Sequence, residues 1–363
     1  MSKTITIHYK EAPIYDITIE KDFHALAESL KGLELKTCKV CIIADSNVAK
    51  QYAGEAGKTL LPAVSEVNTF VFPAGEESKN LNTVMDAYEF LIQHKYDRND
   101  VIIALGGGVT GDLAGFTAST YLRGVRVVQI PTSLLAMVDS SIGGKTGVDF
   151  NAYKNMVGAF HQPKAVYMNL SALLTLSEKQ FNSGFAEVIK HGLLEDAPLY
   201  NWMKENRAAL MDRDLSALEE MIHRSCLDKK RIVEVDPLEK AERALLNLGH
   251  TLGHSIEKLM DFKLLHGECV SIGTVAAAYL SMRRGMITEN ALEDIIETFR
   301  NYKLPVSISG LKPADILAVS KSDKKMEAGH IKFILLKQVG RAVMMKDITD
   351  QELLAAIDFI SVP

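Results

Sequence analysis

Short apolar runs alternate with polar or helical segments over the first 165 residues of the chain. Four of the runs are typical of buried strands, and each ends in turn-forming or small polar residues: KVCIIAD (39–45), NTFVFPAG (68–75), VIIALGGG (101–108) and RVVQIPTS (126–133). Between the second and third runs, residues 80–96 carry apolar side chains at helical spacing. This alternation predicts βαβ units around a mostly parallel sheet, in which ligands bind beyond the carboxyl ends of the strands.

After residue 165 the apolar positions follow a helical period almost throughout. The segments with this pattern are 178–195, 199–211, 214–235, 241–260, 267–285 and 288–302. Residues 330–348 are the exception and predict a hairpin that turns at Gly340. We therefore predict a Rossmann-like α/β domain over residues 1–165 and a mainly α-helical domain over residues 166–363.

Composition and charge narrow the class of protein. The 363 residues are 47% hydrophobic and 24% charged, as in soluble globular proteins, and the net charge of 41 − 46 = −5 disfavours a surface that coats nucleic acid. The longest apolar stretch, residues 270–280, is too short for a membrane span, and the first ten residues lack an apolar signal region. Four cysteines are too few for a disulfide scaffold. We expect a cytoplasmic protein with no nucleic-acid or membrane partner.

A glycine-rich turn follows the third predicted strand. Gly106, Gly108 and Gly111 match G-x-G-x-x-G between a strand and a helical segment, where backbone N–H groups and a helix N-terminus favour a pyrophosphate. The motif departs from the usual dinucleotide fingerprint, because it follows a later strand and no acidic residue ends the next one. Asp45 and Glu76, at the ends of the first two strands, are alternative partners for ribose hydroxyls. The turn favours NAD.

Three of the ten histidines fall within seventeen residues. His250 and His254 are spaced i, i+4 on one helical face, and His266 precedes the next apolar helix. Catalytic zinc takes three nitrogen or oxygen ligands and keeps one position open. The residues do not decide whether His250 or His254 binds the metal, and Glu187 is one candidate for a carboxylate ligand. The H-E-x-x-H pattern of metallopeptidases is absent from the sequence.

Basic residues follow several of these motifs and would suit a phosphate or carboxylate ligand if they gathered in one cleft. They are Lys145, Lys154, Lys190, Lys229, Arg243, Lys324 and Lys325. The tetrad GGKT (143–146) is not a P-loop, because Asp139 stands where that motif requires its first glycine.

Seven ordered motifs together resemble the 3-dehydroquinate synthase family of the sugar phosphate cyclases over essentially the whole chain. The motifs are GEESK (75–79), LGGGVTGDLAGF (105–116), RGVRVVQIPTSLLAMVDSSIGGKTGVD (123–149), KNMVGAFHQP (154–163), SGFAEVIKHG (183–192), RALLNLGHTLGHSIE (243–257) and HGECVSIG (266–273). The resemblance implies a carbon–oxygen lyase of the shikimate pathway of aromatic amino-acid biosynthesis. It would convert 3-deoxy-D-arabino-heptulosonate 7-phosphate to 3-dehydroquinate and phosphate by transient oxidation with NAD, β-elimination of phosphate, re-reduction, ring opening and intramolecular aldol closure.

The same resemblance implies a set of site residues, with NAD and one divalent metal, zinc or cobalt, as cofactors. The implied metal ligands are Glu187, His250 and His266. The implied NAD contacts are Asp45, Asn47, Glu76, Lys79, Gly107, Gly108, Asp112, Thr132, Ser133, Lys154 and Thr175. The implied catalytic and substrate-binding residues are Asp139, Lys145, Lys154, Asn155, Lys190, Lys229, Arg243, Asn247, His254, Arg123 and one of Lys324 and Lys325. Arg123 matches an arginine that reaches the neighbouring subunit's phosphate site, which implies a homodimer.

Three other functions are compatible with parts of the pattern. A cyclase that makes an inosose or valiolone would use a substrate without a carboxylate, which Arg243 and Asn247 argue against. A metal-dependent alcohol or glycerol dehydrogenase of related build would release NADH. An NAD-binding pseudoenzyme is disfavoured because every catalytic position that we can match is intact.

Overall fold

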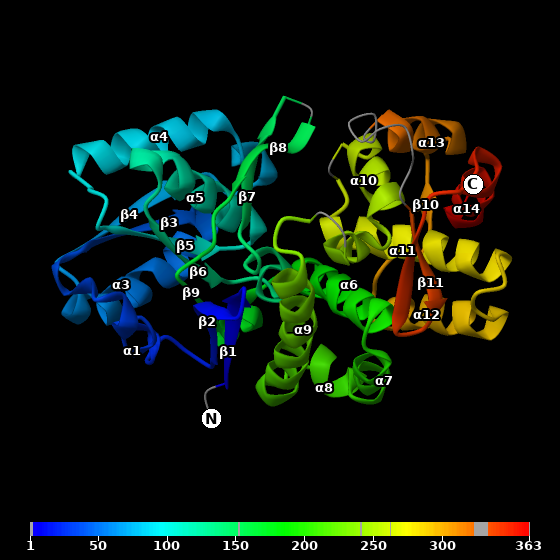
Figure 1. The fold of residues 1–363 in the computed structure, drawn as a ribbon, viewed down its shortest axis with the longest axis horizontal. Helices are drawn as coiled ribbons and strands as arrows, with labels where there is room; N and C mark the ends of the chain where they lie inside the picture. Colours follow the sequence, from blue (N-terminus) through cyan, green and yellow to red (C-terminus); the bar gives the residue numbers. More distant parts are fainter. Residues whose placement is uncertain (1–2, 152, 240–241, 262, 323–332, 363) are drawn as a thin grey trace. The chain divides into compact units, whose positions relative to one another are not determined.

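The computed structural model describes residues 3–151, 153–239, 242–261, 263–322 and 333–362. The chain divides into two compact units, Met1–Leu176 and Ser177–Pro363 (Figure 1). The boundary lies later than residue 165, because strand β9 (Ala165–Asn169) pairs with strands of the first unit. The first unit is built on a mostly parallel sheet and the second is mainly helical, so the predicted fold class is confirmed.

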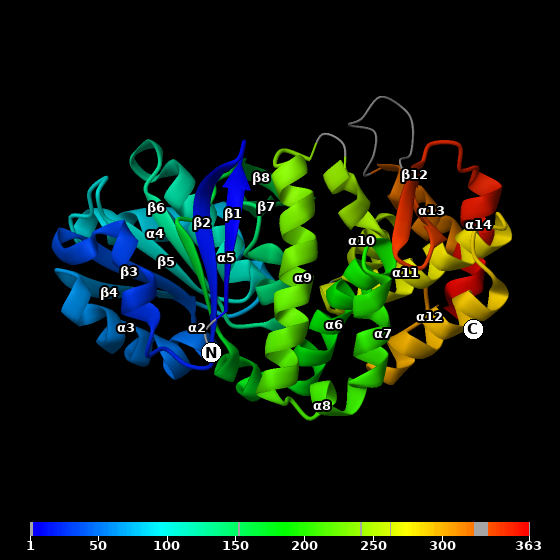
Figure 2. The same ribbon diagram turned by 60° about the horizontal axis from the view of Figure 1, so that its bottom comes forward.

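A seven-stranded sheet forms the centre of the first unit (Figures 1 and 2). In spatial order its strands are β1 (Lys3–Tyr9), β2 (Ala12–Glu20), β9, β6 (Arg126–Pro131), β5 (Val101–Gly106), β3 (Lys39–Asp45) and β4 (Glu66–Phe72). Neighbouring strands are parallel except for the antiparallel pair β1 and β2. The four predicted apolar runs are thus confirmed as strands β3 to β6.

Successive residues of a strand point to opposite faces of the sheet, and both faces of this sheet are buried. On one face, Ile43 of β3 belongs to the same core cluster as Val84 of α4 (Leu81–Gln93) and Leu113 of α5 (Gly108–Thr120). On the other face, Ile42 approaches α3 (Gly54–Leu60) at Gly57. The short helices α1 (Leu26–Ser29) and α2 (Ser46–Val48) complete the unit. Polar binding residues are therefore confined to the strand ends and the loops.

A separate antiparallel hairpin, β7 (Lys145–Phe150) and β8 (Tyr153–Phe160), was not predicted from the sequence. β7 packs against α5, where Thr146 fills the space that a side chain at Gly115 would occupy. Gly147 and Gly158 oppose each other in the ladder. The GGKT segment therefore leads into a strand and not into the helix that follows a P-loop.

Helix α11 (His266–Arg283) lies at the centre of the second unit and is buried along most of its length. It packs against α6, α10, α12, α14 and β11, which explains why the segment is apolar on every face. The helices of the unit are α6 (Glu178–Leu194), α7 (Ala197–Glu205), α8 (Arg207–Met211), α9 (Leu215–Val235), α10 (His250–Leu259), α11, α12 (Glu289–Asn301), α13 (Pro313–Ser322) and α14 (Asp350–Ile360).

Two predicted helices of the second unit are each divided in the structure. Segment 199–211 breaks at Asn206 into α7 and α8. Segment 241–260 breaks at Gly249, whose φ of +78° ends the 3-10 turn Glu242–Asn247 and begins α10. Both breaks depend on single-residue geometry that helical periodicity does not detect.

The C-terminal hairpin is confirmed as β11 (Phe333–Gln338) and β12 (Arg341–Met345), with Gly340 at φ +82° in its turn. Two further short strands, β10 (Ile308–Ser309) and β13 (Ser361–Val362), pair in parallel. Among the described residues, no helix combines the length and the apolar character needed to cross a bilayer.

Candidate metal centre and cofactor loop

Helix α6 carries a carboxylate into the interior of the second unit. The helix begins at the cap Ser177, whose side chain accepts a hydrogen bond from the Gln180 N–H, and it is buried from Phe181 onward. Glu187 is fully buried and forms an ion pair with Lys190, one turn later on the same helix. Its Oε1 atom accepts no hydrogen bond from any described residue. A buried carboxylate oxygen in this condition needs a positive partner.

Helix α10 brings His250 to this carboxylate. The glycines of LGHTLGH allow α10 to lie close to α11, since a side chain at Gly253 would meet the Cys269 carbonyl oxygen at 2.9 Å. His250 is the first residue of α10, and its Nδ1 lies 3.0 Å from the carbonyl oxygen of Leu248. Donation from Nδ1 leaves the lone pair of Nε2 available, and Nε2 lies 3.7 Å from Glu187 Oε1.

The third ligand candidate, His266, is the first residue of α11. Its neighbour Gly267 lies so close to α6 that a side chain there would collide with the backbone of Ser183, and the Gly267 N–H donates to Ser183 Oγ at 3.1 Å. This contact holds the start of α11 against α6. The Nε2 atom of His266 lies 3.5 Å from Glu187 Oε1.

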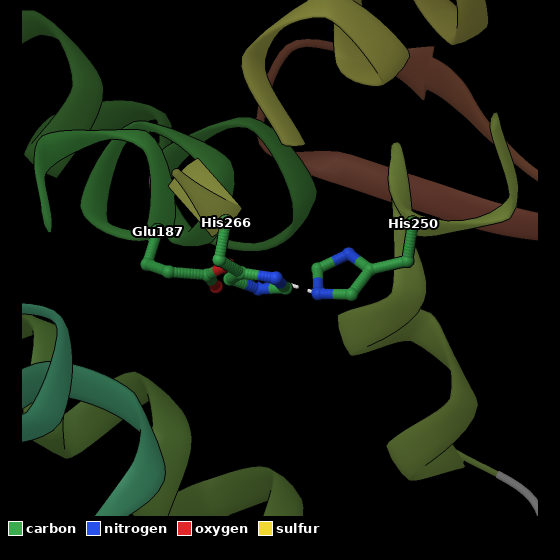
Figure 3. A group of neighbouring side chains, drawn as sticks. All are labelled: Glu187, His250 and His266. Atoms are coloured by element: carbon green, nitrogen blue, oxygen red, sulfur yellow. Dashed lines mark ion pairs between the residues drawn. The ribbon is translucent and has the colours of Figure 1, made fainter. Parts of the chain in front are cut away.

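Glu187, His250 and His266 together form a site with the composition of a catalytic zinc centre (Figure 3). One ligand atom from each residue lies within 4.8 Å of the other two. Both Nε2 atoms point toward the oxygen of Glu187 that has no hydrogen bond, so a cation among them would complete the buried carboxylate. The residues present therefore fit a divalent metal.

The charges around the site also suit a cation. Burial alone would raise the pKa of Glu187, but Lys190, His266 and His250 hold it well below its usual value, so the carboxylate is ionised. Burial, and then the charge of Lys190, lowers the pKa of His250. Burial alone would lower the pKa of His266, but Glu187 and Glu257 have the larger effect and raise the pKa of His266 to about 9.

His254 stands one turn after His250 and is exposed. Its ring centroid lies 5.1 Å from that of His250 and 5.8 Å from that of His266. With His266 it also belongs to a second group of candidate ligands that includes Glu257. The sequence left open whether His250 or His254 binds the metal. In the structure each of them belongs to a separate group of candidate ligands, and the two groups share His266. Only the first group holds the buried Glu187 oxygen without a hydrogen bond.

The other expected residues of the second unit lie on elements that pack together, namely α6, α9 and the 3-10 turn before α10. Lys190, Lys229 and Arg243 are nearly fully buried, which is uncommon for cationic side chains. Arg243 donates from Nη1 to the Pro237 carbonyl oxygen at 2.8 Å. Asn247 donates from Nδ2 to Glu239 Oε1 at 3.0 Å. Lys324 and Lys325 lie outside the described residues.

In the first unit, the glycine-rich turn joins β5 to the N-terminus of α5. The glycines have different neighbours: a side chain at Gly106 would clash with Thr110, and one at Gly111 would meet Gln129 Oε1 at 2.9 Å. At Gly107 and Gly108 the nearest atoms are further away, the hydroxyls of Ser133 and Ser140 at 3.4 and 3.3 Å. Gly106 and Gly111 thus serve packing, whereas Gly107 and Gly108 stand at the N-terminus of α5, where the helix dipole favours an anion.

A buried ion pair stands beside this turn. The Lys79 ammonium lies 2.7 Å from Asp112 Oδ2 and 2.6 Å from Asn155 Oδ1. Burial alone would lower the pKa of Lys79, but the negative charges of Asp112 and Glu76 have the larger effect and raise it. Glu76 in turn forms an ion pair with Lys154 at 3.0 Å. Five expected cofactor or substrate residues thus form one connected network.

The remaining expected cofactor residues lie at strand ends or just beyond them. Asp45 ends β3 and caps α2, accepting the N–H of Asn47 at 2.9 Å. Thr132 and Ser133 follow β6, and the Thr132 N–H donates to the Gly106 carbonyl oxygen at 2.9 Å. Thr175 makes a short hydrogen bond with Tyr52, a residue that the sequence did not single out.

Three expected substrate residues of the first unit lie on other elements. Asp139 lies in the turn Ala136–Ser140, and Lys145 is exposed at the start of β7. Arg123 is exposed and, like Leu122 before it, has a left-handed backbone, with φ of +69°.

Comparisons with known families agree with one another over most of the chain. A family model described as 3-dehydroquinate synthase N-terminal matches residues 69–183, and one described as 3-dehydroquinate synthase C-terminal matches residues 184–326. A 3-dehydroquinate synthase of Acetivibrio thermocellus is 41% identical over 343 residues, which are 94% of this chain and 95% of that protein.

Two solved structures share the fold. The 2-epi-5-epi-valiolone synthase of Streptomyces hygroscopicus, solved with NAD+ and Zn2+, is 28% identical with a TM-score of 0.89, over 95% of this chain and 96% of that one. A 2-deoxy-scyllo-inosose synthase, solved with carbaglucose-6-phosphate, NAD+ and Co2+, is 24% identical with a TM-score of 0.88, over 98% of this chain and 99% of that one.

Proposed function

The chain belongs to the 3-dehydroquinate synthase family, and we propose that Glu187, His250 and His266 hold the divalent metal of its active site. The activity is that of a phosphate-eliminating carbon–oxygen lyase, which converts 3-deoxy-D-arabino-heptulosonate 7-phosphate to 3-dehydroquinate and phosphate in the shikimate pathway. The observation that carries the metal assignment is the buried Glu187 Oε1, which faces two imidazole nitrogens and accepts no hydrogen bond among the described residues.

The first unit is the NAD-binding domain in this proposal, and the second binds metal and substrate. When bound, NAD exchanges a hydride with the substrate and the divalent ion, zinc or cobalt, supplies a Lewis acid. Gly107 and Gly108 receive the pyrophosphate at the N-terminus of α5, where the helix dipole favours an anion. Asp45 and Glu76 accept the ribose hydroxyls. Asn47, Lys79, Asp112, Thr132, Ser133, Lys154 and Thr175 complete the proposed contacts.

The buried cations of the second unit bind the anionic groups of the substrate in this proposal. Arg243 holds the carboxylate, because its planar guanidinium matches a planar anion, and Asn247 lies one turn further along the chain. Lys190 and Lys229 neutralise negative charge close to the metal ligands. His254, the exposed member of the histidine cluster, transfers or holds a proton at a substrate hydroxyl.

The phosphate lies in this proposal near Asp139, Lys145, Lys154 and Asn155 of the first unit. Cations there lower the barrier to β-elimination because negative charge accumulates on the leaving phosphate. One of Lys324 and Lys325, which lie outside the described residues, remains a proposed substrate contact.

We further propose a homodimer in which Arg123 of the partner subunit reaches this phosphate. Support comes from exposed apolar side chains that accompany Arg123, namely Leu122, Phe150, Tyr153, Met156 and Phe160. The last four belong to the β7–β8 hairpin, and His161 directly after β8 is 2.8 Å from the Val125 carbonyl oxygen, beside the Arg123 turn. Exposed apolar clusters of this kind are typical of interfaces.

Mixing two inactive variants tests the shared site. Homodimers of R123A and of E187Q should each be inactive or nearly so. A heterodimer contains one site with an intact Glu187 and an intact arginine from its partner, so co-refolded variants should recover part of the wild-type rate. Recovery of no activity in a verified heterodimer would contradict the shared site.

A cytoplasmic location is supported by the phosphorylated substrate and by the four buried cysteines, which form no disulfide in the described part of the chain.

Turnover with catalytic NAD tests the reaction as a whole. Purified protein with zinc, substoichiometric NAD and the heptulosonate phosphate should release phosphate and form an equal amount of 3-dehydroquinate, with no accumulation of NADH absorbance. Phosphate release without 3-dehydroquinate would indicate a different cyclase, and stoichiometric NADH would indicate a dehydrogenase.

A further inference from the structure

The two ring nitrogens of His266 face two different buried carboxylates. Nε2 lies 3.5 Å from Oε1 of Glu187, and Nδ1 lies 3.8 Å from Oε2 of Glu257. Glu187 is completely buried and Glu257 is only 3% exposed. The nitrogens of an imidazole point away from each other, so one metal ion can bind only one of them.

The position of His250 selects Nε2 as the metal-binding atom. Nε2 of both histidines lies near the same Glu187 oxygen, at 3.7 and 3.5 Å, so a single ion can meet all three atoms. In His250 the other nitrogen, Nδ1, lies 3.0 Å from the Leu248 carbonyl oxygen. Each histidine thus turns Nε2 toward Glu187 and Nδ1 toward an oxygen acceptor.

We propose that Glu257 is a positioning residue, which accepts the Nδ1 proton of His266 and thereby presents Nε2 to the metal. The inference rests on the proposed metal set and assigns a role to a residue outside it. A carboxylate behind a histidine ligand fixes the tautomer and orientation of the ring and makes the ligand nitrogen more basic. Glu257 does not touch the substrate or the metal in this proposal.

The spacing of residues on α10 explains how one helix supplies both a metal ligand and the acceptor for a second ligand. His250, His254 and Glu257 are spaced i, i+4 and i+7, which places them on one face of the helix. That face is held against α11 by the close approaches at Gly249, Gly253 and Gly273. The first turn of α10 therefore supplies a metal ligand, and its last turn supplies the acceptor for the ligand on α11.

Two carboxylate variants test the proposal. E257Q keeps the shape of the side chain and removes the charged acceptor. E268Q is the matched control, because Glu268 lies on the same turn as His266 but accepts the Leu265 N–H at 2.7 Å as part of the helix cap. The zinc dissociation constant is measured by competition with a chromophoric chelator, and the metal-free melting temperature and the Co2+ absorption spectrum are measured alongside.

E257Q should bind zinc about 10- to 100-fold more weakly and alter the Co2+ spectrum. E268Q should lower the metal-free melting temperature but keep the zinc affinity within about twofold. Zinc binding by E257Q within about twofold of wild type, or equal weakening in both variants, would overturn the proposal. Two zinc ions per wild-type chain and one per E257Q chain would also overturn it, because Glu257 would then be a direct ligand with His254.

The wild-type protein provides a second test, in which the metal-bound ring of His266 is observed directly. In zinc-loaded protein labelled with 15N-histidine, the spectrum of His266, assigned by its loss in H266A, should show a protonated Nδ1 and a coordinated Nε2. Coordination through Nδ1 would refute the role of Glu257 while leaving the three-ligand set intact. Full zinc content in both E187Q and H266A would instead refute the proposed metal set itself.

Discussion

Each unit of the protein buries a lysine against a carboxylate, but the two pairs differ in what they leave unsatisfied. In the first unit, Lys79 contacts both Asp112 and Asn155. In the second unit, Lys190 contacts one oxygen of Glu187, and the other oxygen, Oε1, accepts no hydrogen bond from the described residues and faces two histidines. Both lysines are at most 5% exposed.

The first pair is complete by itself, whereas the second needs a further positive partner. A buried charge is costly unless it is paired and hydrogen-bonded, so the Lys79 network stabilises the loop that it joins. In the Glu187 pair, Oε1 accepts no hydrogen bond from the described residues. Part of the favourable free energy of metal binding therefore comes from giving this oxygen a positive partner. A buried carboxylate whose oxygen accepts no hydrogen bond therefore needs either a cation or a proton.

The largest expected effect is that of E187Q, which removes the incomplete carboxylate. The variant should lose stoichiometric zinc and at least about a thousandfold in kcat/KM, because both the ligand and the metal's electrostatic contribution are lost. Zinc content is measured by atomic absorption and turnover by phosphate release. The control E178Q changes an exposed glutamate on the same helix and should retain both properties. Activity of E187Q near the wild-type level would remove the distinction between the two pairs.

Breaking the complete pair should instead destabilise the first unit. K79M leaves Asp112 buried without its lysine, at a cost of about 3 kcal/mol in the free energy of unfolding. The double variant K79M/D112N removes the remaining charge and should recover most of this loss. Urea denaturation of the NAD-free and metal-free proteins measures both values. Zinc stoichiometry should remain at the wild-type value in K79M, whereas its loss would show that the effect of K79M is not confined to the first unit.

Local patterns were sufficient to predict most elements, because they depend on neighbours in the sequence. The apolar runs at 39–45 and 101–106 became β3 and β5, and the helical period at 178–195 became α6. The three expected metal ligands also lie together, although their identity came from resemblance and not from spacing.

Features that depend on tertiary contacts were missed. The β7–β8 hairpin begins in GGKT, and the pairing of Gly147 with Gly158 cannot be inferred from either segment alone. Glu257 lies inside a quoted motif, but its role depends on how closely α10 and α11 approach at Gly253. The i+7 spacing from His250 was the one available signal, and it is equally typical of a helix face that binds nothing.

A third buried carboxylate, that of Asp228, differs from both pairs in the cation that lies near it. Asp228 on α9 lies 3.8 Å from Arg231, and its Oδ2 accepts no hydrogen bond from the described residues. Burial, with Asp196 and Glu195 nearby, raises its pKa to about 7. The proton thus takes the place that we assign to a metal at Glu187.

D228N should therefore stabilise the protein at high pH only. A carboxyl whose pKa is raised by folding stabilises the native state below its unfolded pKa, near 4, and loses that contribution as the pH rises through about 7. At pH 8 the free energy of unfolding of the variant should exceed that of the wild type by about 1–3 kcal/mol, and at pH 4 the difference should vanish. Urea denaturation at the two pH values measures this. An equal gain at both pH values would mean that Asp228 is ionised throughout.

The smallest expected effect belongs to a carboxylate closer to the surface, whose two oxygens both accept hydrogen bonds. Glu352 lies in the first turn of α14 and accepts two hydrogen bonds from Arg284, at 2.7 and 3.0 Å. The hydrogen bond from Arg284 is the main cause that lowers its pKa to about 2. The contribution to stability is present above the unfolded pKa, near 4.5, and declines as the pH falls toward 2.

E352Q should cost about 0.5–1 kcal/mol at pH 7, and this cost should shrink at pH 3. The control E289Q changes an exposed glutamate that begins α12 and should stay within about 0.5 kcal/mol of the wild type. Both values come from urea denaturation at matched ionic strength. A cost as large as that of K79M would show that burial is not what distinguishes these carboxylates, because a solvated pair would then stabilise the fold as strongly as one removed from water.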